Sequence, residues 1–330
     1  MTLVLSAALL FPVLALLAAA QTNNIAGAVA GTKEKDELEK LKKDAVENYK
    51  FGFYDEAFRL SQLALTLGKK LDGEEGKEVA IIYFNIGKIL KMKKLNKEAL
   101  GNFERSLAIF EGKFPDDKRM IVANYSELGF LNDLEGKKAE AEKFFVTALE
   151  RSQSLDGAEG EIVLPHLNNL ANFYEAQKEM KKAEPLLWRA AKLANKLYGY
   201  EDSRAENASD RHSCFLHTYF SNEERKQIPN RNENEDGTKE PKITGSVING
   251  KAKRLEKPAF PLRGFDGPSG TVWVRITIGK SGEILSAKAF CGPRSLWGLS
   301  ELAARRSEFA PTTLDGKPVV VSGIIVYNYQ

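Results

Sequence analysis

The chain contains few of the residues from which disulfide scaffolds and metal centres are built. Its 330 residues include two cysteines, Cys214 and Cys291, and three histidines. So few cysteines exclude a disulfide-rich scaffold and a cysteine-rich zinc module. His212, Cys214 and His217 lie within six residues of one another, but a zinc site would need a fourth ligand and a C-x-x-C partner, and neither is present. We predict no metal site and interpret this group as local packing.

Strong net charge and catalytic motifs are also lacking. The chain has 48 Lys and Arg against 45 Asp and Glu, a formal net charge of +3, which is too small to indicate a nucleic-acid partner. Hydrophobic residues make up 43% and charged residues 28%, a globular balance that excludes a polytopic membrane protein, a collagen and a wholly disordered chain. No glycine-rich phosphate loop, G-x-S-x-G or H-E-x-x-H motif occurs. We therefore predict no enzymatic activity, no cofactor and no small-molecule substrate.

The longest apolar run lies at the N-terminus. Leu3–Ala20 is almost entirely apolar and ends in three alanines before Gln21, which is typical of a signal peptide with a small-residue cleavage site. No lysine or arginine precedes the run, and its 18 residues nearly span a bilayer, so an uncleaved anchor is the alternative. We predict that residues 1–20 direct export as a signal peptide or an anchor, and that residues 21–35 form a tether.

A period of 42 residues is the strongest pattern in the chain. Small residues recur at this interval at three positions of each unit, and the pattern between them is helical, with apolar residues three and four apart. Small residues in fixed register are what two antiparallel helices need where they cross closely. The three series are Ala45, Gly87, Gly129, Ala171; Ala57, Ala99, Ala141, Ala183; and Ala64, Ser106, Ala148, Ala190.

This spacing resembles the tetratricopeptide repeat, in which small residues occupy positions 8, 20 and 27 of a 34-residue unit. The longer period resembles the kinesin-light-chain type, as does the segment Leu167–Tyr174. Position 24 is aromatic or aliphatic in Phe103, Phe145 and Leu187. The first unit departs, with Asp44 and Ser61 at apolar and aromatic positions, and is expected to be a polar capping unit. The predicted all-α superhelix covers residues 36–200, with units at 38–71, 80–113, 122–155 and 164–197.

The resemblance implies a concave face that binds extended or helical peptides. In the family, positions 2, 5, 6, 9 and 12 of each first helix line this face. The candidate groove residues are Phe84, Asn85, Lys88, Lys91, Glu127, Phe130, Asn168, Asn169 and Asn172. Asn85 and Asn169, both at position 6, each supply a donor and an acceptor to a peptide backbone. The alternative, given equal weight, is that they are surface asparagines of a scaffold. The basic pattern with which some repeats hold a terminal carboxylate is not evident.

The period breaks after the fourth unit. Residues 201–244 are interpreted as a linker, because Asn230–Gly237 is polar throughout. Within it, Arg211–Phe220 is less polar and is predicted to form a short capping helix.

Residues 245–330 form a second domain of different character. From Lys251 to Lys317 there are twelve Lys and Arg against six Asp and Glu, a net charge of +6. Alternation predicts strands at Thr271–Ile278, at Glu283–Phe290 and at 319–329, with a helix at Leu296–Arg306 before the last strand. This β-β-α-β order predicts an α+β domain with one helix on an antiparallel sheet. The whole chain is therefore predicted to be an α+β multidomain protein.

The second domain resembles the C-terminal domain of the energy-transducer protein TonB. The shared motifs, in order, are Pro258–Pro261, Gly270–Val274, Ser281–Ile284, an alanine-rich helix followed by Phe309–Pro311, and Asp315–Val319. The resemblance implies that the last strand is a sheet edge that binds an extended segment of an outer-membrane receptor by strand addition. The alternative is that the domain packs on the repeats or self-associates. The candidate edge residues are Val319, Val320, Val321, Ile324, Ile325 and Tyr327.

Two functions follow from this organisation. The first is an exported periplasmic scaffold of the bacterial envelope with two protein-binding surfaces. The second is a TonB-like transducer anchored in the inner membrane by residues 3–20, although the proline-rich spacer of a transducer is absent. Protein or peptide partners are expected in both cases, and the sheet edge could also pair two copies. A Cys214–Cys291 bridge is permitted in an oxidising compartment, but the sequence does not place the two sulfurs.

Overall fold

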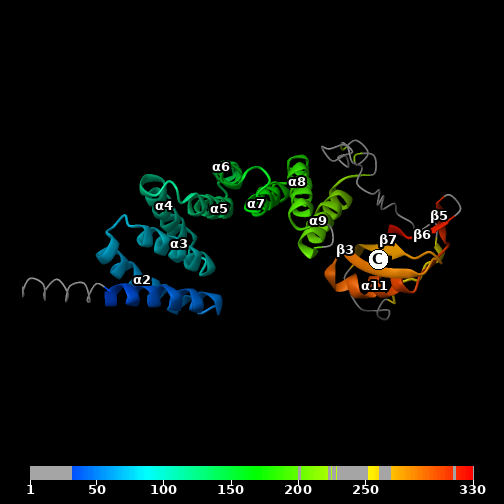
Figure 1. Ribbon diagram of the computed structural model, residues 1–330, viewed down its shortest axis with the longest axis horizontal. Coiled ribbons are helices and arrows are strands. Elements are labelled where there is room, and N and C mark those ends of the chain that lie inside the picture. Colours follow the sequence, from blue (N-terminus) through cyan, green and yellow to red (C-terminus); the bar gives the residue numbers. More distant parts are fainter. Residues whose placement is uncertain are drawn as a thin grey trace, which may run out of the picture. The chain divides into compact units, whose positions relative to one another are not determined.

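The computed structural model describes residues 32–199, 202–221, 224, 228, 252–259, 269–314 and 317–329, in which helices precede a small group of strands (Figure 1). The expected signal peptide or anchor (1–20), most of the tether (21–35) and the polar segment Asn230–Gly237 lie outside these residues. Among the helices described, none is long and apolar enough to cross a membrane. The chain divides into two compact units, Met1–Phe173 and Tyr174–Gln330.

The first unit consists of helical hairpins that follow the predicted repeat boundaries. The first helix covers residues 32–50. The helices that follow are α2 (Tyr54–Asp72), α3 (Lys77–Met92), α4 (Asn96–Lys113), α5 (Lys118–Leu134), α6 (Lys138–Asp156) and α7 (Val163–Ala176). Within each hairpin the two helices pack against each other, as α3 does against α4 and α5 against α6. The predicted helical repeats are therefore confirmed.

The small residue at position 8 of a unit makes room for the aromatic ring at position 24. A Cβ atom on Gly87 would lie 2.8 Å from the ring of Phe103, and one on Gly129 would lie 2.9 Å from the ring of Phe145. Both phenylalanines are buried. At this separation an added methyl group cannot be accommodated without moving the ring or the helix, so glycine sets how closely the two helices cross.

The second unit combines helices with a sheet. Its helices are α8 (Met180–Tyr198) and α9 (Ser203–Tyr219), which pack together, and α11 (Trp297–Arg305), which follows a 3₁₀ turn at Arg294–Leu296. Strands β2 (Gly270–Ile278), β3 (Ile284–Cys291) and β7 (Val321–Tyr329) form an antiparallel sheet in the order β3-β2-β7. Short strands β1 (Ala252–Arg254) and β4 (Glu308–Phe309) pair with each other, as do β5 (Thr312–Leu314) and β6 (Lys317–Val319).

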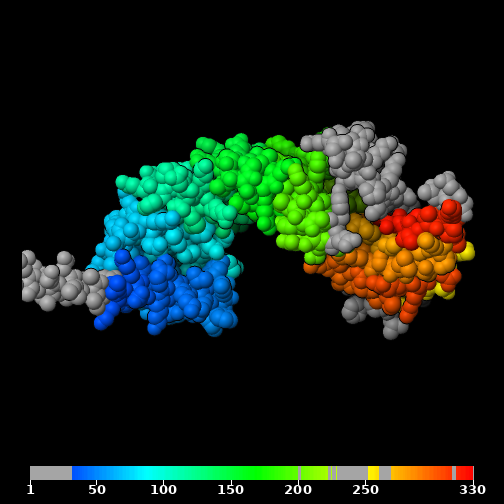
Figure 2. All heavy atoms as spheres, viewed as in Figure 1, coloured from blue at the N-terminus to red at the C-terminus, as the bar shows by residue number. Residues whose placement is uncertain are grey.

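The two faces of the β3-β2-β7 sheet are covered by different helices. On one face Val272, Val274 and Ile276 form a core with Ala303 and Ala304 of α11, as the predicted helix-on-sheet arrangement requires. The opposite face meets α9, whose atoms adjoin the strands in the space-filling view (Figure 2). The alternation along β2 thus places Val272, Val274 and Ile276 toward α11, and Trp273 and Arg275 toward α9.

Two boundaries differ from the sequence predictions. The long last strand is in fact two strands, because Val319 pairs with Thr312 in the β5-β6 hairpin and Val320 belongs to no strand. The first part of the expected linker 201–244 is the 17-residue helix α9. Its start is fixed by Asp202, whose carboxylate accepts a hydrogen bond from the Arg204 N–H at 2.8 Å, so the helix begins well before the predicted Arg211.

The close crossing gives a first prediction. Gly129→Ala should lower the free energy of unfolding by about 1–3 kcal/mol through overpacking against Phe145, although alanine is favoured over glycine in a helix by about 1 kcal/mol. Gly101→Ala is the control, because a Cβ atom there meets nothing within 4 Å, and this change should stabilise the protein. Urea unfolding of the two variants measures both effects, and equal shifts of the same sign would contradict the account.

A buried histidine gives a second prediction. His166 lies 3.0 Å from the Ser126 hydroxyl, and burial lowers the pKa of its imidazole. Above the unfolded pKa of about 6.5 both states are neutral, whereas below it the unfolded chain takes up a proton that the folded chain resists. The free energy of unfolding should therefore fall as the pH drops from 7 to 5, by up to about 1.4 kcal/mol per pH unit. His166→Gln should flatten the profile, and parallel profiles would count against this explanation.

Candidate peptide-binding surface and sheet edges

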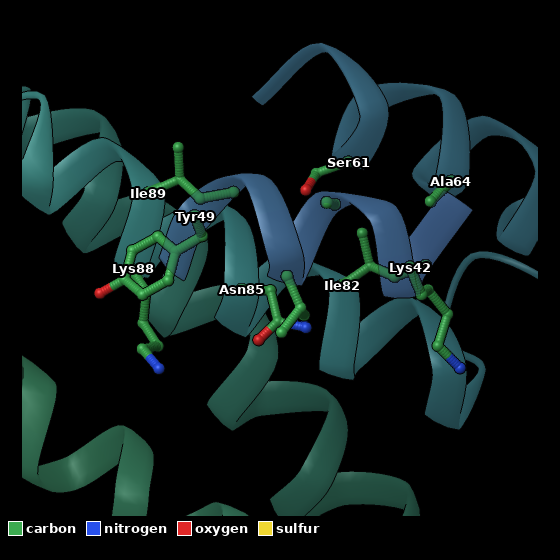
Figure 3. Close-up of a pocket in the computed structure, with 10 residues that line it drawn as sticks. Lys42, Tyr49, Ser61, Ala64, Ile82, Asn85, Lys88 and Ile89 are labelled. Atoms are coloured by element: carbon green, nitrogen blue, oxygen red, sulfur yellow. The ribbon is translucent and has the colours of Figure 1, made fainter. Parts of the chain in front are cut away.

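A cavity of about 130 Å³ opens between helix 32–50, α2 and α3 in the first unit (Figure 3). Its walls combine apolar side chains with polar groups from the first helices of repeats 1 and 2. The lining residues are Lys42, Ala45, Val46, Tyr49, Ser61, Ala64, Ile82, Asn85, Lys88 and Ile89. Two of the predicted groove residues, Asn85 and Lys88, are thus brought together in one cavity. Ser61, which departs from the family pattern, is buried in its wall.

The two lysines of the cavity, Lys42 and Lys88, have different partners. Lys42 forms ion pairs with Glu39, at 2.7 Å, and with Glu78. Burial lowers the pKa of Lys42, but the two carboxylates outweigh it and the pKa is raised. The ammonium of Lys88 instead lies 5.2 Å from the centre of the Tyr49 ring.

Within the described residues Lys88 has no carboxylate partner and the Asn85 amide has no hydrogen-bond partner. Burial raises the pKa of Tyr49, so its phenol stays protonated and remains a donor. The cavity therefore offers apolar walls, a cation, an amide and a phenol to a bound segment.

Three other predicted groove residues, Lys91, Glu127 and Phe130, interact with one another. Lys91 of α3 forms an ion pair with Glu127 of α5, and its ammonium lies 5.6 Å from the centre of the Phe130 ring. The Phe130 ring is edge-on to Phe145 at 5.1 Å. This group joins the first helices of two successive repeats, so part of its polarity serves the contact between repeats. The signal in the sequence is the separation of 36 residues, which joins position 12 of one unit to position 6 of the next.

The remaining predicted groove residues are placed less favourably. Phe84 packs edge-on against Phe103 at 5.4 Å and against the core of the unit, so we reassign it from the groove to packing. The Asn168 amide donates to the Leu164 carbonyl of its own helix at 3.1 Å. Asn169 is half-buried on α7 and Asn172 is exposed there.

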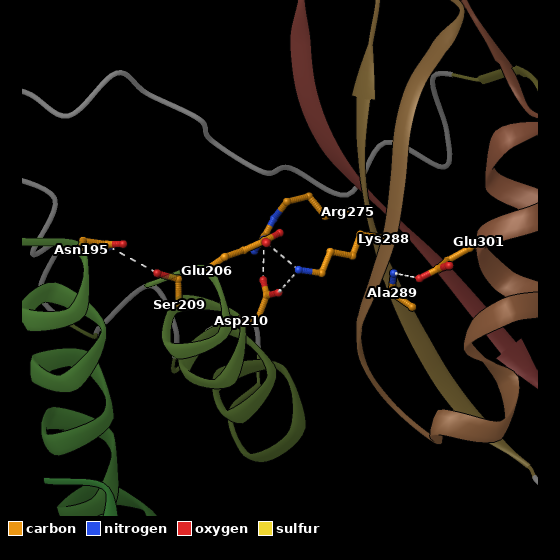
Figure 4. Close-up of polar contacts among 8 residues, drawn as sticks. All are labelled: Asn195, Glu206, Ser209, Asp210, Arg275, Lys288, Ala289 and Glu301. Atoms are coloured by element: carbon orange, nitrogen blue, oxygen red, sulfur yellow. Dashed lines mark hydrogen bonds and ion pairs between the residues drawn. The ribbon is translucent and has the colours of Figure 1, made fainter. Parts of the chain in front are cut away.

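The two outer strands of the β3-β2-β7 sheet have different edges. Along β3, the Ala289 N–H donates to the Glu301 carboxylate at 2.8 Å (Figure 4), and Arg305 donates to the Ala287 carbonyl at 3.0 Å. Both acceptor and donor come from α11. Main-chain groups that an added strand would need are therefore occupied by side chains. Sequence reasoning missed these caps, because nothing in the spacing of Glu301 and Arg305 shows that they reach the strand.

Strand β7 is the other outer strand in this order. Ile324, Ile325 and Tyr327 are buried, and Val321 is half-buried. Burial raises the pKa of Tyr327 to about 12, so its phenol stays neutral. Strand addition here would use main-chain groups. Val319 and Val320 are excluded from this edge, because they lie outside β7.

Comparison with known proteins supports the repeat assignment. One tetratricopeptide-repeat family model matches residues 45–112, and a second matches residues 166–205. These segments are tetratricopeptide repeats, and the fold is of a kind typical of non-enzymatic scaffolds that bind protein or peptide partners. No curated protein matches the chain.

Three solved structures are similar to part of this chain. One is a structure of the TPR-like repeats of a kinesin light chain of Podosopora anserina, whose repeats are nearly identical to one another. Its sequence is 17% identical to this chain, with a TM-score of 0.49 over 58% of this chain and 89% of that chain. BtubC (BKLC) from P. vanneervenii is 17% identical, with a TM-score of 0.45 over 58% of this chain and 92% of that chain. The apo form of RapI is 17% identical, with a TM-score of 0.48 over 59% of this chain and 51% of that chain.

The capped edge gives a third prediction. Replacing both Glu301 and Arg305 by alanine should uncover β3 and produce concentration-dependent dimers, because unpaired edge groups template pairing with another chain. Sedimentation velocity measures the change. The control is Arg306→Ala, which alters an exposed side chain beside Arg305 and should leave sedimentation unchanged. A double variant that sediments as the unaltered chain does would show that the caps do not protect this edge.

Proposed function

We propose that the chain is an exported scaffold of the bacterial cell envelope that binds one protein segment in the groove of its repeats and another at the edge of its C-terminal sheet. The cavity at Asn85 and Lys88 is the observation on which the first binding surface rests. It lies at the ligand-facing positions that the repeat register assigns. Among the described residues, the Lys88 cation has no carboxylate partner and the Asn85 amide has no hydrogen-bond partner.

The chemistry of the cavity indicates the class of ligand. Apolar walls favour an aliphatic or aromatic side chain. Asn85 pairs with a peptide group through its donor and acceptor, and Lys88 favours an acidic residue beside the inserted side chain. We therefore propose an extended peptide with an apolar residue next to an aspartate or glutamate.

Export is supported by two observations. Leu3–Ala20 has the composition of an export signal. Cys214 and Cys291 form a disulfide with their Cα atoms 5.0 Å apart, and disulfides persist mainly in oxidising compartments such as the periplasm.

The second binding surface is β7, where strand addition remains a proposal based on the TonB resemblance and on the capping of the opposite edge.

The anchored transducer is the second candidate. It is favoured by the length of the apolar run, 18 residues without a charge, which nearly spans a bilayer. N-terminal sequencing of the natively produced protein after cell fractionation separates the two. A start near Gln21 in the periplasmic fraction supports the scaffold, and an intact Met1 in the inner membrane supports the transducer.

The peptide surface gives a fourth prediction. Peptides selected from a displayed random library against the purified protein should bind Asn85→Ala and Lys88→Ala at least about 10-fold more weakly, because each hydrogen bond to a charged or peptide group contributes about 1–3 kcal/mol. Fluorescence polarisation measures the affinities.

Lys94→Ala is the matched control for this experiment, since Lys94 is exposed and does not line the cavity. It should bind as the unaltered chain does. Selected peptides that bind all three variants equally would place the ligand outside this cavity and overturn the proposal.

A further inference from the structure

Helix α9 continues the repeat register one helix beyond the fourth unit. Adding the period of 42 to Ala171 gives Ser213, a small residue on α9. The ion pairs repeat as well. Lys91 and Glu127 are 36 residues apart, and so are Glu175 and Arg211, which lie 3.4 Å apart. Position 12 of one first helix thus meets position 6 of the next in both cases. The register thus gives α9 the positions of a first helix.

The same register identifies the ligand-facing positions of α9. Positions 5, 6, 9 and 12 fall on Asp210, Arg211, Cys214 and His217, which correspond to Asn168, Asn169, Asn172 and Glu175 of α7. Three of these four α9 residues contact the C-terminal sheet. Asp210 forms an ion pair with Arg275, Cys214 is bonded to Cys291, and the His217 ring stacks on Trp273 with the ring centres 5.8 Å apart.

Charge on the two surfaces is complementary. On the sheet, Lys288 lies 2.6 Å from Glu206 and 4.0 Å from Asp210, next to Arg275 (Figure 4). The Asp210 side chain is only 9% exposed, and a carboxylate so far withdrawn from water needs a cation beside it. The acidic side of α9 is thus matched to the basic side of the sheet.

An apolar patch lies within this charged frame. Phe290, Cys291 and Ile324 are buried, with Cys214, Trp273 and Val326 packed against them. The Arg275 guanidinium lies 4.9 Å from the centre of the Phe290 ring. An apolar centre with a charged rim has the composition of a protein-binding interface.

We propose that the face of the β3-β2-β7 sheet that meets α9 is a ligand of the repeats within the same chain. It occupies the positions of α9 with which a first helix binds its partner. The Cys214–Cys291 bridge holds it there. A dithiol reductant opens the bridge: its thiolate attacks one sulfur, two electrons and two protons are transferred, the two cysteine thiols form and the reductant leaves as its own disulfide. Once the bridge is open, the sheet face fits an acidic amphipathic helix such as α9. This inference does not depend on export or on the cavity ligand.

Hydrogen exchange of the full chain, followed by mass spectrometry, tests the proposal. The oxidised chain should protect residues 203–219 and 284–291. The combined variant carries Cys214→Ser, Cys291→Ser and Asp210→Asn. Its backbone amides should exchange at least about 10-fold faster in these two segments, while α8 and β2 stay protected. The control is Asp210→Asn with the bridge intact, which should exchange almost as the unaltered chain does, because the covalent bond keeps the surfaces together.

Two results would overturn the proposal. Unchanged protection of both segments in the combined variant would show that α9 and the sheet form one inseparable core. Equal loss of protection in α8 and β2 would show general unfolding rather than separation of two surfaces.

A synthetic peptide with the sequence 203–219, carrying Cys214→Ser, tests recognition directly. It should bind the combined variant at least about 10-fold more tightly than the oxidised chain, whose sheet face is occupied. Equal affinity for the two proteins, or no measurable binding to either, would contradict recognition of α9 by the sheet.

Discussion

The close approach of a small residue to an aromatic ring sets how the two helices of a repeat cross, and the register of the repeats depends on this crossing. Gly87 faces Phe103 and Gly129 faces Phe145, and a Cβ atom at either glycine would lie under 3 Å from the ring. A contact this short fixes how far apart two helices lie and which faces meet. The small residue itself recurs every 42 residues, and this register determines which positions of each first helix are left to face a ligand or the next repeat.

The surface features follow from that register. Asn85 and Lys88 line a cavity with residues of helix 32–50, whereas Lys91 and Glu127 pair across repeats. The same positions on α9 meet the C-terminal sheet. One set of positions therefore serves three purposes, and the side chains present at each repeat decide which: unpaired polar groups around a cavity, a salt bridge, or a disulfide within an apolar patch.

Regular features were predictable from the sequence because they depend on local periodicity. The helical repeats and the main sheet with its helix follow from the spacing of small and apolar residues. The structure has the helical hairpins and the order β2-β3-α11-β7, with the short strands β1, β4, β5 and β6 in addition. Features that depend on tertiary contact were not predictable. Val319 has strand propensity, but its pairing with Thr312 instead of β2 depends on the hairpin.

The site illustrates the same limit. Helix α9 was predicted only in part, as a short capping helix at Arg211–Phe220 within a linker. Its contacts could not be predicted, because Arg275 and Cys291, the partners of Asp210 and Cys214, lie 65 and 77 residues further along the chain. The edge caps at Glu301 and Arg305 were missed for a similar reason, since an exposed charge and a capping charge have the same appearance in a sequence. Asn85 and Lys88 line one cavity, as their register in the sequence predicts, and their binding role stays a prediction.

The bond between Cys214 and Cys291 joins a ligand-facing position of α9 to the sheet of the second domain, and it also supports export to an oxidising compartment. Non-reducing peptide mapping of the protein purified from its own cells, with thiols blocked at lysis, measures it directly. The account predicts one cross-linked pair of peptides containing these two cysteines. Recovery of both cysteines as blocked free thiols would contradict the covalent attachment of the sheet to α9 and remove the structural support for export.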